Sequence, residues 1–155
     1  MQNSSRHLAH LASFTATPLV FITASTGHRN RLLNNAVAHE CLHEIWTRSS
    51  ELDGWCVGDY LLMPDHVHLF ARPSAAAKTM KAWVKMWKSV SSRKMAHALG
   101  IEASIWQADY FDRYLRNGDS YSDKWQYVEL NPVRAGLVET ADQWPYKGRI
   151  WDLSL

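Results

Sequence analysis

The chain has 155 residues and a formal net charge of +2, nearly half of its residues are apolar, and eight are tryptophan. This length suits one domain with a sizeable core, and no apolar run is long enough to cross a bilayer. The N-terminus lacks the basic start and unbroken apolar segment of a signal peptide, and two cysteines are too few for a disulfide framework. We therefore expect a single cytoplasmic domain over residues 1–155, with no membrane partner.

The predicted elements begin with a strand at 19–25 (LVFITAS), a helix at 34–49, a strand at 55–63 (WCVGDYLLM), a tight turn at Pro64-Asp65 and a returning strand at 66–72. A long helix follows at 75–99, then a short strand at 104–107 (SIWQ). A last helix runs from about Ser120 to Asn131, where Pro132 discourages continuation. The order β-α-β-β-α-β, followed by a helix and tail, predicts an α+β, ferredoxin-like fold, in which an antiparallel sheet carries helices on one face.

Two histidines interrupt the apolar segment LLMPDHVHLF at residues 61–70. Side chains alternate along a strand, so His66 and His68 lie side by side on one face while Val67 points into the core. The pair can share a metal ion. It can also be two polar residues on a solvated sheet face, and so short a motif does not decide between these readings.

A second histidine pair falls in the first predicted helix, where HECLH matches the H-E-x-x-H signature of zinc proteases. His39 and His43 would lie one turn apart, with Glu40 available as a base. The extended form of that signature fails, because Trp46 stands at the expected glycine and Ser49 at the expected third histidine. An accidental match is the better interpretation, and a zinc protease is the weakest functional hypothesis.

The last predicted helix has a core stripe and a polar stripe. The core stripe is Tyr121, Trp125 and Val128, and the polar stripe is Ser120, Lys124, Tyr127 and Asn131. Tyr127 is thus off the core face, one turn before Asn131. A tyrosine among polar neighbours is often only a surface residue, so this pattern alone assigns it no role.

Positive charge is concentrated in the long helix, because no acidic residue occurs from Pro73 to Ile101. A stripe at helical spacing contains Lys78, Lys81, Lys85 and Lys88, and Arg93 follows. A solvated helix usually mixes charges of both signs, so the stripe favours binding to phosphates. In the next segment, IWQADYFDRYLRN, Arg113 and Arg116 can contact a DNA backbone or form internal salt bridges. Asp109 and Asp112 are expected near the active face as possible accessory groups.

Four segments in this order, MPDHVHLF, WKSVSSRKM, IWQADYFDRYLRN and YVELNPVRAGLV, resemble the REP-associated tyrosine transposases, a group of the HUH single-tyrosine transposases in the IS200-like superfamily. The resemblance covers roughly residues 19–146. It implies metal ligands at His66 and His68 and a nucleophile at Tyr127. It also implies a third ligand at Asn131, where relatives often have glutamine, and DNA contacts from Lys88 and its helix.

The implied activity is metal-dependent nicking and joining of single-stranded DNA through a 5′-phosphotyrosine intermediate, with REP-type hairpins as the implied substrate, Mg²⁺ or Mn²⁺ as the metal and no nucleotide cofactor. The metal, a water molecule or Lys124 would help Tyr127 to lose its proton. The resemblance leaves open whether the protein acts as a monomer or a homodimer. A catalytically inert DNA-hairpin-binding protein of the same fold is the alternative.

Overall fold

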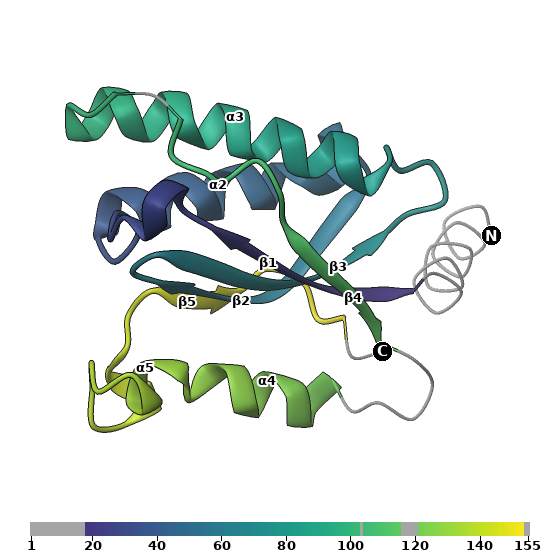
Figure 1. The fold of residues 1–155 in the computed structure, drawn as a ribbon. Coiled ribbons are helices and arrows are strands. Elements are labelled where there is room, and N and C mark those ends of the chain that lie inside the picture. Colours follow the sequence, from purple (N-terminus) through teal and green to yellow (C-terminus); the bar gives the residue numbers. More distant parts are fainter. Residues whose placement is uncertain (1–17, 103, 116–120, 154–155) are drawn as a thin grey trace.

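The computed structural model describes residues 18–102, 104–115 and 121–153, which form one sheet with helices on both sides (Figure 1). Its elements in chain order are β1 (Leu19–Ser25), α2 (Ala36–Leu52), β2 (Trp55–Met63), β3 (His66–Pro73), α3 (Met80–Leu99), β4 (Phe111–Leu115), α4 (Tyr121–Glu129), α5 (Asn131–Arg134) and β5 (Lys147–Arg149). The first six follow the predicted order β-α-β-β-α-β.

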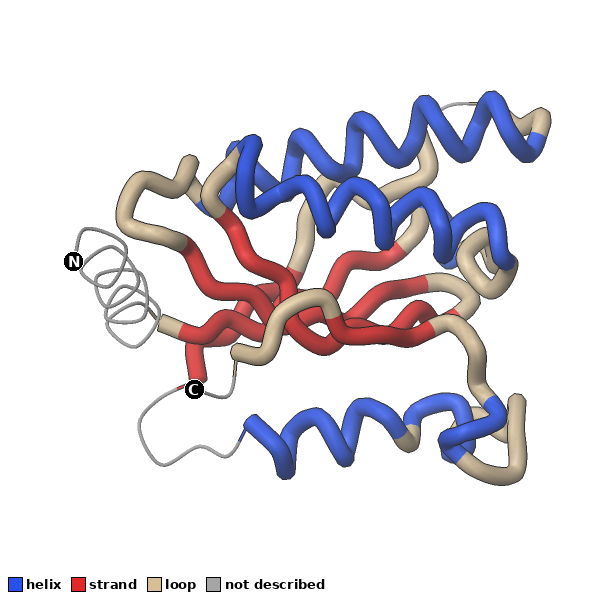
Figure 2. The backbone as a smooth tube through the Cα atoms, turned by 180° about the vertical axis from the view of Figure 1, so that it is seen from behind, coloured by secondary structure: helices blue, strands red, loops and turns tan. Residues whose placement is uncertain are grey.

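The sheet has five strands in the order β4-β1-β3-β2-β5, and every neighbouring pair is antiparallel. Helices α2 and α3 cover one face, while α4 and α5 cover the other, which we call the α4 face (Figures 1 and 2). The predicted α+β class is confirmed. None of the helices in the described ranges combines the length and apolar character that a membrane span requires.

The predicted strand at 104–107 is wrong. Within it Trp106 forms only an isolated bridge with Thr26, and the strand that continues the sheet begins at Phe111. Before β4 the chain leaves the ladder, and the Lys88 ammonium group donates hydrogen bonds of 2.9 Å to the carbonyl oxygens of Gln107 and Asp109. A lysine from α3 therefore satisfies backbone groups that the sheet does not pair.

Helix α3 begins five residues later than predicted, at Met80, because the Thr79 side chain accepts a hydrogen bond from the Ala82 amide and caps the helix there. Lys78 consequently precedes the helix. The helix ends at Gly100, whose φ of +66° gives the left-handed turn that glycine adopts without strain. In α2 (predicted at 34–49) the buried residues are Ala38, Leu42, Ile45, Trp46 and Ser49, whereas Val37 is exposed.

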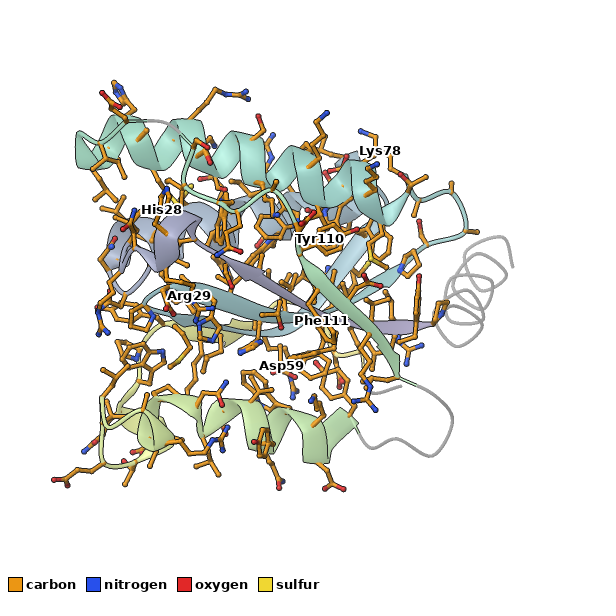
Figure 3. The ribbon with its side chains drawn as sticks, viewed as in Figure 1. His28, Arg29, Asp59, Lys78, Tyr110 and Phe111 are labelled. Atoms are coloured by element: carbon orange, nitrogen blue, oxygen red, sulfur yellow. The ribbon has the colours of Figure 1, made fainter. Side chains whose placement is uncertain are left out.

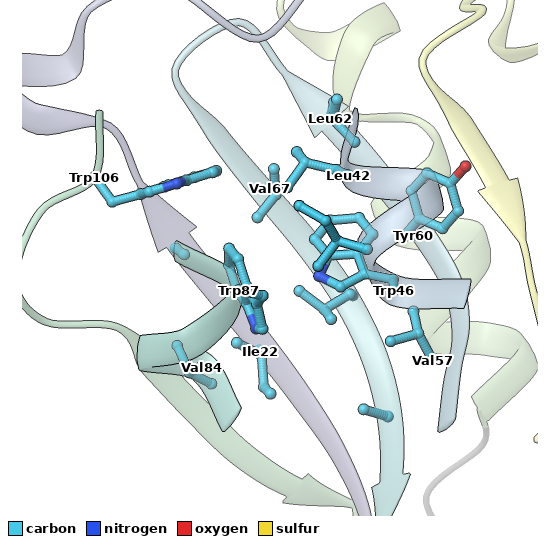
Figure 4. Close-up of a cluster of buried hydrophobic side chains, with 14 of the residues drawn as sticks. Ile22, Leu42, Trp46, Val57, Tyr60, Leu62, Val67, Val84, Trp87 and Trp106 are labelled. Carbon is cyan, nitrogen blue, oxygen red and sulfur yellow. The ribbon is translucent and has the colours of Figure 1, made fainter. Parts of the chain in front are cut away.

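The larger core lies between the sheet and helices α2 and α3 and is rich in tryptophan (Figure 4). Trp46 of α2 meets both Trp87 of α3 and Tyr60 of β2 edge to face, with ring centroids 5.5 and 5.2 Å apart. Trp55 stacks on Trp83 with centroids 4.8 Å apart. Such aromatic pairs add to the free energy gained by burying their area, so this side gives the fold most of its hydrophobic stabilisation.

A smaller cluster on the α4 face holds α4 against the sheet. Tyr121 and Trp125 pack on Phe70 of β3, with ring centroids 4.5 and 6.3 Å away, and Val128 is buried beside them. The predicted core stripe of the last helix is therefore confirmed. Tyr127, which lies off this stripe, remains accessible.

Polar contacts anchor the first turn of α4 on the side chain of Asp59, which lies between the sheet and α4 (Figure 3). The Tyr121 hydroxyl donates a hydrogen bond of 2.6 Å to one Asp59 oxygen and accepts one from the Asp59 amide. Arg149 of β5 donates to the other Asp59 oxygen at 3.1 Å. Burial, aided by the Asp59 carboxylate, raises the pKa of Tyr121, so the phenol stays a hydrogen-bond donor. This anchor links α4, β2 and β5.

Replacing Tyr121 by phenylalanine is expected to lower the free energy of unfolding by about 1–3 kcal/mol, because one Asp59 oxygen and the Asp59 amide lose their partner away from water. Urea unfolding monitored by tryptophan fluorescence measures the change. Tyr114→Phe is the matched control, since Tyr114 is 50% exposed and its replacement should change stability by no more than about 0.5 kcal/mol. Equal stabilities for the two variants would contradict a stabilising role for the anchor.

Candidate active site

His66 and His68 lie on β3 and face α4. His68 is opposite Thr23 of β1 in the sheet. The His68 ring stacks on Phe21, which belongs to the smaller cluster beneath α4, so the His68 side chain points toward α4. The two imidazoles meet edge to face with ring centroids 4.8 Å apart. The predicted side-by-side arrangement of the two histidines on one face is therefore present in the structure.

The orientation of His66 is fixed by a chain of polar contacts that begins in the turn after β1. Arg29 donates a hydrogen bond of 2.9 Å from Nε to Asp65, and the other Asp65 oxygen lies 2.7 Å from His66 Nδ1. His28 and Arg29, both labelled in Figure 3, have φ values of 54° and 55°, which non-glycine residues rarely adopt. A carboxylate only accepts hydrogen bonds, so His66 carries a proton on Nδ1, which leaves Nε2 as the ring nitrogen that could bind a metal ion.

The same carboxylate stays ionised. Partial burial works to raise the pKa of Asp65, but the hydrogen bonds from Arg29 and His66, together with their charges, outweigh it and hold the pKa below its usual value. Metal-binding histidines commonly donate their second ring nitrogen to a carboxylate in this way. The sequence motif PDHVH contains Asp65, but only the fold reveals its partner Arg29.

His68 is held by Thr23, whose hydroxyl oxygen lies 2.8 Å from His68 Nδ1. Its ring stacks on Phe21 at a centroid distance of 5.3 Å and an interplanar angle of 15°. Burial, with smaller contributions from His66 and Lys124, lowers the pKa of His68 to about 3. A neutral imidazole whose Nδ1 faces a hydroxyl can offer its Nε2 lone pair to a metal ion.

Tyr127 lies on α4 and is 61% exposed, as its position off the core stripe predicts. Lys124, one turn earlier, connects it to the histidines. The Lys124 ammonium lies 4.8 Å from the centroid of Phe21, which stacks on His68, and 5.9 Å from that of Tyr127. The Arg134 guanidinium covers the Tyr127 ring at 4.0 Å. Two cations thus lie against the Tyr127 ring.

Asn131 is not on a continuous helix with Tyr127. Helix α4 ends at Glu129, and Asn131 opens the short helix α5, in which Pro132 occupies a first-turn position where its missing N–H costs nothing. The Asn131 side-chain oxygen accepts a hydrogen bond from Arg134, which also donates to the Tyr127 carbonyl at 2.5 Å. No cluster of three His, Cys, Asp or Glu side chains suited to a metal occurs in the described ranges. The Asn131 amide oxygen keeps a second lone pair beside the one that accepts the hydrogen bond from Arg134.

The expected accessory acids lie elsewhere. Asp112 pairs with Ile22 of β1, so it points to the face covered by α2 and α3, opposite the histidines. Asp109 lies beside Lys88 at a cavity on that same side. The expectation that both carboxylates lie at the active face is therefore wrong. Strand register corrects it for Asp112, and the position beside this cavity corrects it for Asp109. Arg113, paired with Phe21, does point to the α4 face. Arg116 lies outside the described residues.

The basic residues of α3 line a cavity of about 580 Å³ between that helix and residues 104–110. Its cationic lining is Lys81, Lys85, Lys88 and Arg93. Lys88 is half-buried by its contacts with two backbone carbonyls, and burial lowers its pKa. Lys78 pairs with the buried Asp53 at 2.7 Å. Lys81, Lys85 and Arg93 are exposed on this surface.

The histidines of the HECLH segment have a structural partner. His39 Nε2 and His43 Nδ1 lie 2.7 and 2.8 Å from the hydroxyl of Tyr60, a buried residue of β2. Both ring nitrogens converge on one phenol, and burial raises the pKa of that phenol to about 12. This arrangement ties α2 to the sheet and accounts for the histidine spacing without a zinc ion.

Comparison with known proteins places the chain among transposases. The model of the family described as "Transposase IS200 like" matches residues 18–131. The REP-associated tyrosine transposase of Escherichia coli K12 is 27% identical over 100 residues, which cover 64% of this chain and 54% of that protein. The chain spans about half the length of the curated relatives it matches.

Two solved structures share the fold. A REP-associated tyrosine transposase bound to a REP hairpin has a TM-score of 0.65 at 19% identity, covering 89% of this chain and 84% of its own. A Deinococcus radiodurans structure described as a transposase has a TM-score of 0.54 at 20% identity, covering 73% of this chain and 89% of its own. The resemblance found in the four sequence segments is thus confirmed, and the chain belongs to the IS200-like transposase family.

Proposed function

We propose that this protein is a metal-dependent enzyme that nicks and rejoins single-stranded DNA, with Tyr127 as its nucleophile. One observation carries the proposal. His66 and His68 lie on the α4 face of the sheet, and the Nδ1 atom of each is held by a neighbouring side chain, so Nε2 is left for a ligand. The Lys124 ammonium group of α4 lies near both the Tyr127 ring and the Phe21 ring, and Phe21 stacks on His68. Two imidazoles and an accessible phenol therefore belong to one polar site.

The residues suit a divalent ion. Asp65 and Thr23 occupy the Nδ1 atoms of the two histidines, which leaves each Nε2 lone pair for coordination. The Asn131 amide oxygen would be the third protein ligand. Two imidazoles with an amide and DNA phosphate oxygens fit Mn²⁺ or Mg²⁺, and manganese fits this donor set better. When bound, the ion would neutralise the phosphate oxygens and make the phosphorus easier to attack.

The chemistry of the chain's own residues is an exchange of one phosphate ester for another. The phenolic oxygen of Tyr127 attacks the phosphorus, the bond from phosphorus to the 3′ oxygen breaks, and the product is a 5′-phosphotyrosine with a free 3′-OH. The phenol loses its proton and the departing 3′ oxygen gains one. Lys124 and Arg134 stabilise the phenolate. Because the ester bond is conserved, the 3′-OH of another strand can reverse the step without an external energy source.

The proposed substrate is a DNA hairpin with a single-stranded flank. The structural relative bound to a REP hairpin supports this choice. The exposed cations Lys81, Lys85 and Arg93 of α3 supply positive charge for phosphates, which predicts affinity that falls steeply with salt concentration. Lys78 and Lys88, which are engaged within the protein, would contribute less.

The test is to trap the covalent intermediate. A labelled hairpin oligonucleotide with single-stranded flanks is incubated with the protein and Mn²⁺, the products are separated on a denaturing gel, and the adduct is digested for peptide mass spectrometry. A nucleotide attached to Tyr127 would support the proposal. Binding without an adduct would favour a catalytically inert hairpin-binding protein. Failure to bind or cleave a panel of hairpins would remove the proposed substrate.

Replacing Asp65 by asparagine is expected to weaken Mn²⁺ binding about 10- to 100-fold, because His66 loses the charged acceptor that fixes its tautomer and raises its basicity. Isothermal titration calorimetry with MnCl₂ measures the affinity. Glu51→Gln is the control, since Glu51 is an exposed carboxylate near the end of α2, across the sheet from the histidines. Equal affinities for the two variants would show that Asp65 does not tune His66.

A further inference from the structure

Phe111, at the start of β4, is an apolar side chain that the core does not use (Figure 3). The phenylalanines Phe21 and Phe70 are 5% and 0% exposed, whereas Phe111 is 60% exposed. It lies on an edge strand, where an exposed aromatic promotes unwanted pairing between molecules. A large ring in such a position contributes little to stability, so it is a candidate for binding.

Strand register places Phe111 in the same row as the histidines. Phe111 pairs with Thr23 of β1, and Thr23 pairs in turn with His68 of β3. Residues directly opposite one another in antiparallel strands point to the same face, so all three side chains face α4. Two strand spacings separate Phe111 from His68, which is a distance of about 10 Å. A base close to the phosphate at the histidines would reach the ring.

Positive charge accompanies the ring. Arg113 pairs with Phe21 and therefore points to the same face, two residues along the strand from Phe111. The intervening Asp112 points to the opposite face, and so does Tyr114, which pairs with Val20. An exposed aromatic beside an exposed cation is the combination that holds single-stranded nucleic acid, because the ring stacks on a base and the cation contacts the backbone.

We propose that Phe111 forms a base-stacking subsite for an unpaired nucleotide beside the cleaved phosphodiester, and that Arg113 contacts the backbone of the same strand. This inference rests on the proposed DNA-cleaving function and extends it to the path of the strand. The single-stranded DNA would run from the histidines past Thr23 and over the edge of the sheet at β4. Base stacking tolerates any base, so the subsite positions the strand without reading its sequence.

The experiment combines protein variants with abasic substrates. Hairpin oligonucleotides carry one abasic position, moved stepwise along the single-stranded flank, and their affinities for wild type and Phe111→Ala are measured by fluorescence anisotropy. With the intact substrate, Phe111→Ala is expected to bind about 5- to 150-fold more weakly than wild type. At one position near the cleaved bond, the abasic substitution should weaken wild type but not Phe111→Ala, because both changes remove the same contact.

Two further variants make the result specific. Phe111→Trp should keep the affinity, since it keeps a stacking ring. Tyr114→Ala removes an aromatic ring that is 50% exposed on the other face of β4, and this variant should match wild type with every substrate. If wild type binds and cleaves while Phe111→Ala behaves identically, the subsite is overturned and the proposed function stands. If wild type neither binds nor forms an adduct, the proposed function fails and the subsite falls with it.

Discussion

Tyr127→Phe is expected to abolish formation of the covalent protein–DNA adduct while hairpin affinity stays within about twofold of wild type. The substitution removes one oxygen, which is the atom that would attack phosphorus. The loss in the cleavage rate should be about 10³-fold or more, as is usual when the nucleophile of an enzyme is removed. The ring is 61% exposed, so the free energy of unfolding should change by no more than about 0.5 kcal/mol.

Single-turnover cleavage of the labelled hairpin measures the rate, and fluorescence anisotropy measures the affinity. Tyr114→Phe serves as the control, because it removes the same hydroxyl from a tyrosine that is 50% exposed on β4. It should cleave at the wild-type rate. An adduct that persists in Tyr127→Phe would assign the nucleophile to another residue and reject the proposed mechanism.

Removing an imidazole should have a comparably large effect on metal-dependent cleavage. His66→Ala and His68→Ala each delete one of the two proposed nitrogen ligands, and with one imidazole left the site should bind Mn²⁺ too weakly for cleavage at millimolar metal. Calorimetric titration with MnCl₂ and single-turnover cleavage across a series of Mn²⁺ concentrations measure the two effects. A partial recovery of cleavage at high Mn²⁺ would identify lost affinity as the cause.

The two variants differ in their structural risk. His68 is packed against Phe21 and bonded to Thr23, so His68→Gln is a necessary second variant that keeps the volume of the side chain. Urea unfolding establishes whether each variant is folded. His97→Ala, at an exposed position in the last turn of α3, is the control and should retain full activity. Full metal-dependent cleavage by a folded His66→Ala variant would remove His66 from the metal site.

Much of the fold could be predicted because hydrophobic periodicity is a local signal. The apolar run at 55–63 and the alternation at 66–72 specify the β2–β3 hairpin, and the spacing of Tyr121, Trp125 and Val128 gives the buried side of α4. The expected strand at 104–107 failed because Trp106 is buried by contacts with α3, where its indole donates to Ser91. That contact joins segments distant in sequence, which a local pattern does not reveal.

The candidate site likewise has features that local sequence patterns predict and features that depend on tertiary contacts. The His66–His68 spacing and the off-core position of Tyr127 follow from strand and helix periods, so the sequence contains them. The contacts of Arg29, Thr23 and Lys124 depend on how β1 and α4 meet β3, and a single sequence does not specify them. The correction of Asp112 has the same origin, because its face was decided by the starting residue of β4.

The separation of the two cores has a consequence for how the protein can move. The tryptophan-rich core keeps the sheet, α2 and α3 together without help from α4. Helix α4 rests on the smaller cluster and on the Asp59 anchor, so we expect it to open locally at a lower free energy than the rest of the domain. Tyr127, which α4 carries, would then move away from the histidines without a global unfolding event. Substitutions in the smaller cluster beneath α4 are expected to change how readily this helix separates from the sheet.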